Sequence, residues 1–347
     1  MKDKLRIMAE RPLNAETPAE HLRSWITPNA VFFARNQGAI PPRRIPLTRW
    51  SLTVDGRVEE PRTFTFEQIR RMPRAIAADT LECSGNGRAL LTERAAGNPW
   101  TIGGVGNAVW AGVWLKDVLA PCRPDAAAAH VAFEGFDQPL GSAGVKFIRS
   151  IPLGKALDST LLAYEMNGEP LPLAHGYPLR ALALGWTGAN CVKWLSRITL
   201  LDRPLEGFFM DNVYRVFQKG QDSRSGQVVT QLPLKSIITQ PLAGERLPTG
   251  TVVVLGAAYA GEGRVAAVEV SVDGGVSWRP AEFIGPDEAF AWRQWQFVWE
   301  ARTPGPFTLM ACALDAGGRR QPMQAEWNVL GYGNNGVRNH AVTVTIV

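Results

Sequence analysis

The sequence predicts an α+β protein of two domains, in which a mixed domain of short strands and helices precedes an immunoglobulin-like β-sandwich. A chain of 347 residues is long for a single hydrophobic core. In the first part, strands and short helices follow one another without the regular spacing of βαβ units. After about residue 235 helical periodicity ends, and about seven short strands follow. We therefore expect domains at residues 1–235 and 236–347.

Four segments of the first part carry clear signals of secondary structure. Residues 50–57 alternate apolar and polar side chains and reach an Asp-Gly pair, which predicts a strand and a hairpin turn. Residues 65–72 begin with a threonine and precede a proline, as short helices do. Residues 76–82 predict a short apolar strand, and residues 113–119 predict a second short amphipathic helix.

The second part consists of alternating segments separated by turn residues. Residues 265–278 predict a hairpin that turns at Asp273-Gly-Gly. Residues 307–317 and 340–347 predict two further strands, the second of which closes the chain. Since the paired cysteines of antibody domains are absent, only the sandwich architecture is expected.

Composition and charge exclude several classes of protein. The chain is 46% hydrophobic and 20% charged, a globular balance, and its net charge of +5 is spread out without the basic block of a nucleic-acid-binding protein. The four cysteines form no C-x-x-C pair, which argues against zinc ribbons, iron–sulfur clusters and c-type haem. The glycines of residues 103–106 lack the spacing of a dinucleotide-binding fingerprint.

The sequence contains no segment that predicts a membrane span. No stretch approaches the roughly 18 apolar residues that are needed. Residues 1–8 are charged and no apolar region follows them, so the sequence as given predicts a cytoplasmic protein. A periplasmic location would follow if a leader had been removed.

The segment 81–88, Leu-Glu-Cys-Ser-Gly-Asn-Gly-Arg, is the most informative in the chain. Its glycines would let another molecule approach the backbone closely. Asn86 and Arg88 add hydrogen-bond donors and a fixed positive charge beside Cys83. From these residues alone, Cys83 is either a soft metal ligand or reactive thiolate, or an inert buried residue.

Together with other motifs, this segment resembles the sulfite oxidase family of molybdopterin enzymes, in the form that lacks a haem domain. The motifs occur in the order of the family, at residues 26–36, 83–88, 175–180, 188–195, 232–241, 270–278, 291–296 and 327–330. The resemblance implies a molybdopterin-binding catalytic domain at residues 1–235 and a dimerisation domain at 236–347.

The resemblance also implies how molybdenum and its molybdopterin would be held. Cys83 matches the cysteine whose thiolate binds the metal, which suits a soft ligand. The positions that match those around the pterin and its phosphate are Phe33, Asn36, His175, Arg180 and Lys193. The remaining cysteines match no ligand position, and we expect them to be buried packing residues: Cys122, Cys191 and Cys312.

The substrate pocket that the resemblance implies would bind sulfite, a compact anion suited to the guanidinium fork. The matching positions are Arg35, Arg88, Trp100, Tyr214 and Arg293, with Arg293 reaching in from the second domain. The chain departs from the family's pattern at four places, and three of these departures reduce the number of charged or titratable side chains around the site. These are Gln37, Gly87, Ala174 and the residues that surround Tyr214.

The implied activity is that of a sulfite oxidase or sulfite dehydrogenase, which oxidises sulfite to sulfate by oxygen-atom transfer. Electrons would pass to a separate acceptor, either a cytochrome c-like carrier or a small molecule, and the sandwich would form a homodimer. A nitrate reductase and a reductase of S-oxides such as methionine sulfoxide are alternatives with the same fold. A non-catalytic binding module is a third, because β-sandwiches are also common scaffolds.

Overall fold

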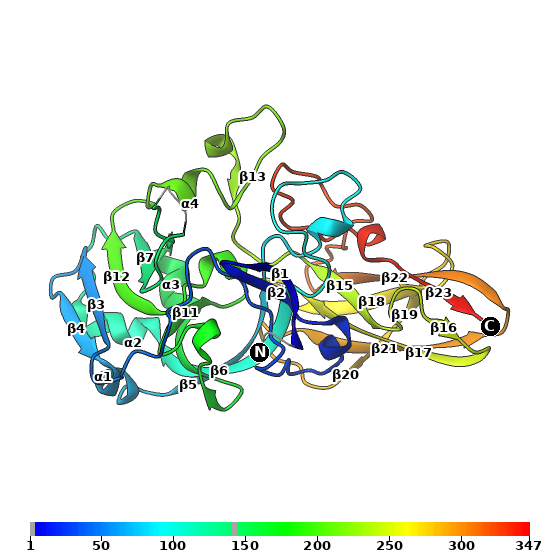
Figure 1. Ribbon diagram of the computed structural model, residues 1–347, viewed down its shortest axis with the longest axis horizontal. Helices are drawn as coiled ribbons and strands as arrows, with labels where there is room; N and C mark the ends of the chain where they lie inside the picture. Colours follow the sequence, from blue (N-terminus) through cyan, green and yellow to red (C-terminus); the bar gives the residue numbers. More distant parts are fainter. Residues whose placement is uncertain (1–3, 141–143) are drawn as a thin grey trace.

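The computed structural model describes residues 4–140 and 144–347, which form two parts that lie end to end (Figure 1). The first part contains the mixed sheets and the helices. The second part is a two-layered β-sandwich whose far end holds the C-terminus. The predicted fold class is therefore confirmed.

One sheet of the first part has the strand order β4-β3-β12-β7-β8. Strands β12 and β3 run parallel, although they lie far apart in the sequence, and the other pairs are antiparallel. The strands are β3 (Ser51–Gly56), β4 (Arg62–Thr65), β7 (His130–Gly135), β8 (Ile148–Pro152) and β12 (Leu195–Leu201).

A second sheet has the order β10-β9-β6-β5, and a further strand, β11, also pairs with β9. All of its pairs are antiparallel. Strand β5 is the predicted strand that leads to Cys83, and it ends one residue before it. The strands are β5 (Ala75–Glu82), β6 (Val105–Trp114), β9 (Thr160–Met166), β10 (Glu169–Pro170) and β11 (Arg180–Ala183).

Short helices connect these strands. Thr65 caps α1 (Phe66–Arg70) in a reciprocal capping box with Gln68, which confirms the predicted start of this helix. The other helices are α2 (Leu115–Leu119), α3 (Leu153–Ser159) and α4 (Phe208–Asp211). Helix α2 begins two residues later than predicted, because residues 113 and 114 continue strand β6 against β9.

Two small hairpins complete the first part. One joins β1 (Arg6–Glu10) to β2 (Leu13–Glu16), and the other joins β13 (Arg215–Val216) to β14 (Gln227–Val228). Neither was predicted, since short polar strands carry no strong periodicity.

The sandwich packs a sheet of order β15-β17-β21-β20 on a sheet of order β16-β23-β22-β18-β19. Trp295, Phe297 and Trp299 of one sheet meet Leu309 and Val344 of the other in the core. The strands are β15 (Lys235–Gln240), β16 (Arg246–Leu247), β17 (Gly250–Tyr259), β18 (Val265–Ser271), β19 (Arg279–Pro280), β20 (Glu282–Ile284), β21 (Arg293–Ala301), β22 (Gly305–Asp315) and β23 (Val342–Ile346).

Two details of the predicted sandwich differ. The hairpin forms, but its second strand, β19, begins at Arg279, just beyond the predicted range 265–278. The loop extends past Asp273-Gly-Gly, because the side chain of Asp273 accepts hydrogen bonds from the backbone N–H groups of Val276 and Ser277. The last strand begins at Val342, because His340 belongs to a short 3-10 helix, η8 (Arg338–His340). The boundary between residues 235 and 236 stays a prediction.

The two parts contact each other through buried side chains. Trp25 and Trp292 each donate the indole N–H to the other's backbone carbonyl, at 3.3 and 2.9 Å. Around them, an apolar cluster joins Leu22 and Val105 of the first part to Ala257 of β17. The position of the sandwich is therefore tied to the first part by directed contacts.

Among the residues that the structure describes, no helix is long and apolar enough to cross a membrane.

The close packing of β17 on β21 predicts the effect of one added methyl group. A Cβ at Gly256 would overlap the fully buried ring of Trp295. We expect Gly256→Ala to lower the free energy of unfolding by about 1–3 kcal/mol, as overpacked cores do. Gly154→Ala is the matched control, because a Cβ in α3 meets nothing within 4 Å. Chemical denaturation of both variants tests this, and equal midpoints would contradict it.

Candidate active site

Cys83 stands at the start of a tight loop that strand β5 and its neighbour hold in place. Its N–H donates to the carbonyl of Gly104 at 2.8 Å, and its own carbonyl accepts from the N–H of Asn86 at 2.8 Å. Gly87 has φ +85°, a conformation that favours glycine. The loop therefore holds Cys83, which is only 6% exposed, in a defined position.

Two cavities meet at this thiol. The first, which we call the His175 cavity, encloses about 690 Å³ of space when its open side is included. The second, the Arg88 cavity, encloses about 620 Å³ on the same basis. The residues that line both cavities are Arg35, Gln37, Cys83 and Tyr214.

The His175 cavity holds buried polar atoms that lack partners in the protein. His175 Nε2 and Arg180 Nε have no hydrogen-bond partner among the described residues. Arg180 donates to the carbonyl of His175 at 3.0 Å and lies over the ring of Trp110 at 5.0 Å. Burial, followed by the charges of Lys193 and Arg180, lowers the pKa of His175 to about 3. His175 is thus neutral at pH 7, with one ring nitrogen free for a ligand.

Lys193, Phe33 and Asn36 complete this group of predicted residues in the same cavity. The ammonium of Lys193 donates to the carbonyl of Ala174 at 3.0 Å and to the side chain of Asn36. Burial, and then Arg180, lowers the pKa of Lys193 well below its ordinary value. An anion bound beside Lys193 would oppose that shift by favouring the charged form.

Arg88 lies in the wall of the other cavity, in a slot lined by glycines. Its guanidinium donates to the carbonyls of Asn98 at 2.8 Å and Leu330 at 2.9 Å. A Cβ at Gly97 would lie 2.7 Å from Nη1, and a Cβ at Gly331 would lie 2.9 Å from Cγ. The slot fixes the orientation of the Arg88 side chain. Nε and Nη1 are bound to the two carbonyls, and the rest of the guanidinium can bind a ligand.

Arg35 and Trp100 line the Arg88 cavity together with Cys83. Arg35 donates to the side chain of Asn14 at 3.1 Å. Burial lowers the pKa of Arg35, but nearby Tyr214 and Cys83 outweigh burial, so the pKa is raised overall. Trp100 is fully buried in the wall of the Arg88 cavity, and its indole N–H has no partner in the described part of the chain.

Tyr214 reaches both cavities and has a strained backbone, with φ +59°. Gln37 donates to its hydroxyl at 2.6 Å. The ring of Tyr214 stacks on that of Tyr332, with centroids 5.5 Å apart and an angle of 16° between planes. The hydroxyl of Tyr214 is therefore held in a fixed position beside Cys83.

The two rings are the middle of a four-layered stack. The guanidinium of Arg149 lies 5.2 Å from the ring centre of Tyr214, and that of Arg88 lies 5.5 Å from the ring centre of Tyr332. Arg149 is fully buried, and it donates to Asn190 at 3.1 Å and to the carbonyl of Phe209. Burial lowers the pKa of Arg149 to about 10, so it stays charged at pH 7.

The structure does not bring Arg293 to either cavity, and in this respect it corrects the sequence analysis. Arg293 begins strand β21, where it forms an ion pair with Asp287 at 2.6 Å. Its guanidinium lies 4.2 Å from the ring centre of Phe283 on the adjacent strand β20. Sequence reasoning also missed Arg149 and Tyr332, which no local motif marks.

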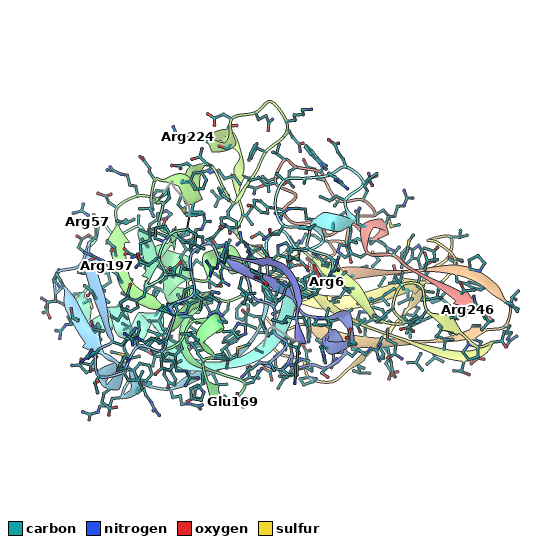
Figure 2. All side chains as sticks on the ribbon, viewed as in Figure 1. Arg6, Arg57, Glu169, Arg197, Arg224 and Arg246 are labelled. Atoms are coloured by element: carbon teal, nitrogen blue, oxygen red, sulfur yellow. The ribbon has the colours of Figure 1, made fainter. Side chains whose placement is uncertain are left out.

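Five cationic side chains of the two cavities and the stack form no ion pair with any carboxylate of the described residues. By contrast, Arg57 and Arg197, at the outer edge of the first part (Figure 2), pair with aspartates. Because a buried charge is costly without a counterion, this arrangement calls for anionic ligands. The five are Arg35, Arg88, Arg149, Arg180 and Lys193.

The thiol of Cys83 fits a soft metal in this setting. Burial raises its pKa, while Arg35 and Arg88 act in the opposite direction. A bound metal ion deprotonates a coordinating thiol, and both guanidinium groups would favour the resulting thiolate. The unpaired donors of the His175 cavity and the excess of cations fit an anionic organic group beside that metal.

Known protein families match the chain in two segments. Residues 37–209 match the family described as "Oxidoreductase molybdopterin binding domain". Residues 226–345 match the family described as "Mo-co oxidoreductase dimerisation domain".

Relatives of known name match almost the whole chain. Mitochondrial sulfite oxidase of Rattus norvegicus is 36% identical over 99% of this chain and 66% of its own length. Sulfite oxidase of Gallus gallus is 35% identical over 94% of this chain and 75% of its own length. Nitrate reductase [NADH] 2 of Phaseolus vulgaris is 31% identical over 95% of this chain and 41% of its own length. The chain thus spans less than two thirds of several relatives.

Among solved structures, the sulfane dehydrogenase SoxCD of Paracoccus pantotrophus superimposes with a TM-score of 0.85 and 28% identity. The match covers 98% of this chain and 88% of that one. Fold and sequence agree, and a segment that matches the molybdopterin-binding domain precedes one that matches the dimerisation domain. The chain therefore belongs to the sulfite oxidase family of molybdopterin-dependent oxidoreductases.

Proposed function

We propose that this chain oxidises sulfite to sulfate at a molybdenum centre held by Cys83. The observation that carries the proposal is the position of one buried thiol where two cavities meet, among cations that form no ion pair with a carboxylate of the described chain. The sulfite oxidases of rat and chicken, at 36% and 35% identity, support the choice of reaction. When bound, the molybdopterin group supplies the two-electron redox chemistry and the transfer of oxygen.

In this proposal, the His175 cavity holds the molybdopterin. Arg180 and Lys193 would bind its phosphate, because a phosphate needs fixed cations and donors that converge on it. The free Nε2 of His175 would take a hydrogen bond from the pterin or donate one to it. Phe33 and Asn36 would contact the ring system from the same wall.

The Arg88 cavity would bind the substrate. Arg35 and Arg88 offer guanidinium groups to the oxygens of sulfite, and their charge would offset its repulsion from an anionic metal centre. The unpaired indole N–H of Trp100 and the hydroxyl of Tyr214 add donors from two other directions. A neutral S-oxide would gain little attraction from this positive charge, so the cavity favours an anionic substrate.

Several finer points of the proposal concern partners. Electrons would leave to a separate acceptor, such as a cytochrome c-like carrier, and the sandwich would hold two copies of the chain together. The matched dimerisation domain supports the second point. Nitrate is the rival anion, since a plant nitrate reductase is 31% identical. Assays with sulfite, nitrate and methionine sulfoxide separate these reactions, and turnover of only a rival substrate would overturn the proposal.

Replacing the metal ligand gives the most direct test. We expect purified wild-type protein from a host that makes the cofactor to contain about one molybdenum per chain. Cys83→Ser should lose sulfite turnover while its thermal unfolding stays close to that of the wild type, because the loop backbone is held by its own hydrogen bonds. Cys312→Ser, a buried cysteine of the sandwich, is the matched control. Sulfite turnover retained in Cys83→Ser would contradict thiolate ligation.

The stack predicts that Arg149 contributes the third positive charge of the substrate site. At a separation of about 10 Å and an effective dielectric of about 20, two unit charges attract by about 1.7 kcal/mol. We therefore expect Arg149→Met to raise KM for sulfite roughly tenfold, with a smaller change in kcat. Arg149→Lys keeps the charge and should restore much of the affinity.

Arg293→Met provides the comparison for this prediction, because Arg293 has its own aspartate partner outside both cavities. Steady-state kinetics at two salt concentrations, with thermal unfolding of each variant, checks the outcome. A rise in KM for Arg293→Met and none for Arg149→Met would mean that the sequence-based assignment was right.

A further inference from the structure

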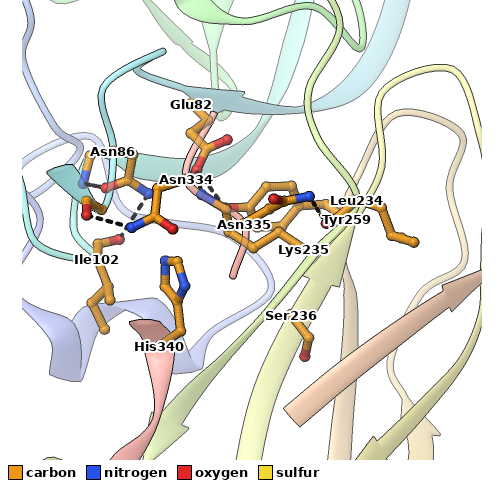
Figure 3. A network of polar contacts seen from close by, with 12 residues as sticks. Glu82, Asn86, Ile102, Leu234, Lys235, Ser236, Tyr259, Asn334, Asn335 and His340 are labelled. Atoms are coloured by element: carbon orange, nitrogen blue, oxygen red, sulfur yellow. Dashed lines mark hydrogen bonds and ion pairs between the residues drawn. The ribbon is translucent and has the colours of Figure 1, made fainter. Parts of the chain in front are cut away.

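A buried polar network joins Glu82 and Asn86 to Lys235 and Tyr259 of the sandwich (Figure 3). Its centre is one oxygen, Glu82 Oε1, which accepts three hydrogen bonds. The donors are Lys235 Nζ at 2.6 Å, the Tyr259 hydroxyl at 2.8 Å and Asn86 Nδ2 at 2.9 Å. Glu82 and Lys235 are only 2% and 0% exposed, so solvent cannot replace these bonds.

The network joins the loop to two neighbouring strands of the sandwich. Glu82 and Asn86 flank the Cys83 loop, whereas Lys235 belongs to β15 and Tyr259 to β17. Lys235 and Tyr259 are direct partners in the pairing of these strands. The sheet therefore presents an ammonium and a hydroxyl side by side to one carboxylate of the first part.

A continuous chain of hydrogen bonds leads from Lys235 to the backbone of Cys83. Asn86 donates to Glu82 and, through Oδ1, accepts from the N–H of Gly104 at 2.9 Å. The carbonyl of Gly104 in turn accepts from the N–H of Cys83 at 2.8 Å. If the carboxylate moved, Asn86 and Gly104 would have to move with it.

The sandwich part of the chain also holds the loop at two other points. Asn334 Nδ2 donates to the carbonyl of Gly87 at 2.7 Å, and the N–H of Gly333 donates to the carbonyl of Ser84 at 2.9 Å. His340 Nε2 would lie 3.0 Å from a Cβ at Gly87. These contacts come from the segment that precedes β23, which is far from Cys83 in the sequence.

We propose that Lys235 and Tyr259 are positioning residues for the metal-binding cysteine, so that the sandwich helps to set the geometry of the metal centre in addition to any role in dimerisation. The reason is that Glu82 is buried next to Cys83 and that, among residues 4–140 and 144–347, its ion-pair partner is Lys235 of the sandwich alone. Without these donors the carboxylate of Glu82 would take another position, and the Cys83 loop would shift with it. The inference rests on the proposed assignment of Cys83 as the metal ligand.

The test compares variants of the network in the full-length protein carrying its cofactor. Tyr259→Phe removes one donor and keeps the ring, and Lys235→Met removes the ammonium. Because Lys235→Met leaves a carboxylate buried and unpaired, the double variant Glu82→Gln/Lys235→Met serves if the single one does not fold. Ser236→Ala is the matched control. Ser236 lies on the same strand as Lys235, and its hydroxyl accepts a buried hydrogen bond from the indole N–H of Trp295, away from the Cys83 loop.

The main measurement is the electron paramagnetic resonance spectrum of the molybdenum after partial reduction with dithionite, because it reports the ligand geometry without substrate. We expect altered spectra in the network variants and a wild-type spectrum in Ser236→Ala. We also expect kcat to fall about 10- to 100-fold, with KM within about twofold, as for a displaced reacting group. Wild-type spectra in the network variants, or an equal change in Ser236→Ala, would overturn the inference.

A second measurement separates this inference from the proposed function. In the cofactor-free full chain, the rate at which iodoacetamide alkylates Cys83 is followed by peptide mass spectrometry. We expect the rate to change at least severalfold in Tyr259→Phe and not in Ser236→Ala. If wild-type protein from a competent host holds no molybdenum, the proposed function fails, whereas an unchanged alkylation rate defeats the inference about Lys235 and Tyr259.

Discussion

The site depends on one constraint, which is buried positive charge that has no ion-pair partner among the carboxylates of residues 4–140 and 144–347. An isolated charge away from water is costly, and proteins usually pair such a charge or shift its pKa. Here Lys193 and His175 shift toward the neutral form, while Arg149 remains charged at pH 7 although its pKa is lowered to about 10. Anionic ligands would relieve this cost and thereby stabilise the folded chain, since they bind only the native state.

A second kind of buried charge lies on the opposite side of the same loop. Glu82 and Cys83 are successive residues at the end of β5, and successive side chains of a strand point to opposite faces. Glu82 therefore faces the sandwich, where Lys235 neutralises it, and Cys83 faces the cavities. The ion pair between Glu82 and Lys235 holds the loop in place. The cations of the two cavities form no ion pair with a described carboxylate, so they can bind anionic ligands. The end of strand β5 therefore directs Glu82, which supports the loop, and Cys83, the proposed metal ligand, to opposite faces.

The sequence predicted those parts of the site that depend on local pattern. The β5 strand, the Cys83 loop and the group around His175 were all recognisable from short motifs, and the structure brings them together. The family resemblance implied that Arg293 lines the substrate pocket, but no motif in the sequence reveals that Asp287 pairs with it. Arg149 could not be identified either. It lies in an ordinary strand, β8, and the role proposed for it rests on its contact with Tyr214, which only tertiary packing reveals.

The proposed role of Arg149 in place of Arg293 would change how the substrate site discriminates between ligands. A third arginine in the wall would contact the anion directly, whereas Arg149 lies behind the ring of Tyr214. A charge behind an aromatic ring would give attraction without a directed hydrogen bond. It would therefore favour negative charge over neutral molecules, but it would not select one arrangement of oxygens. In the proposed site, selection by shape would then depend on Arg35, on Arg88 in its glycine slot, and on the fixed hydroxyl of Tyr214.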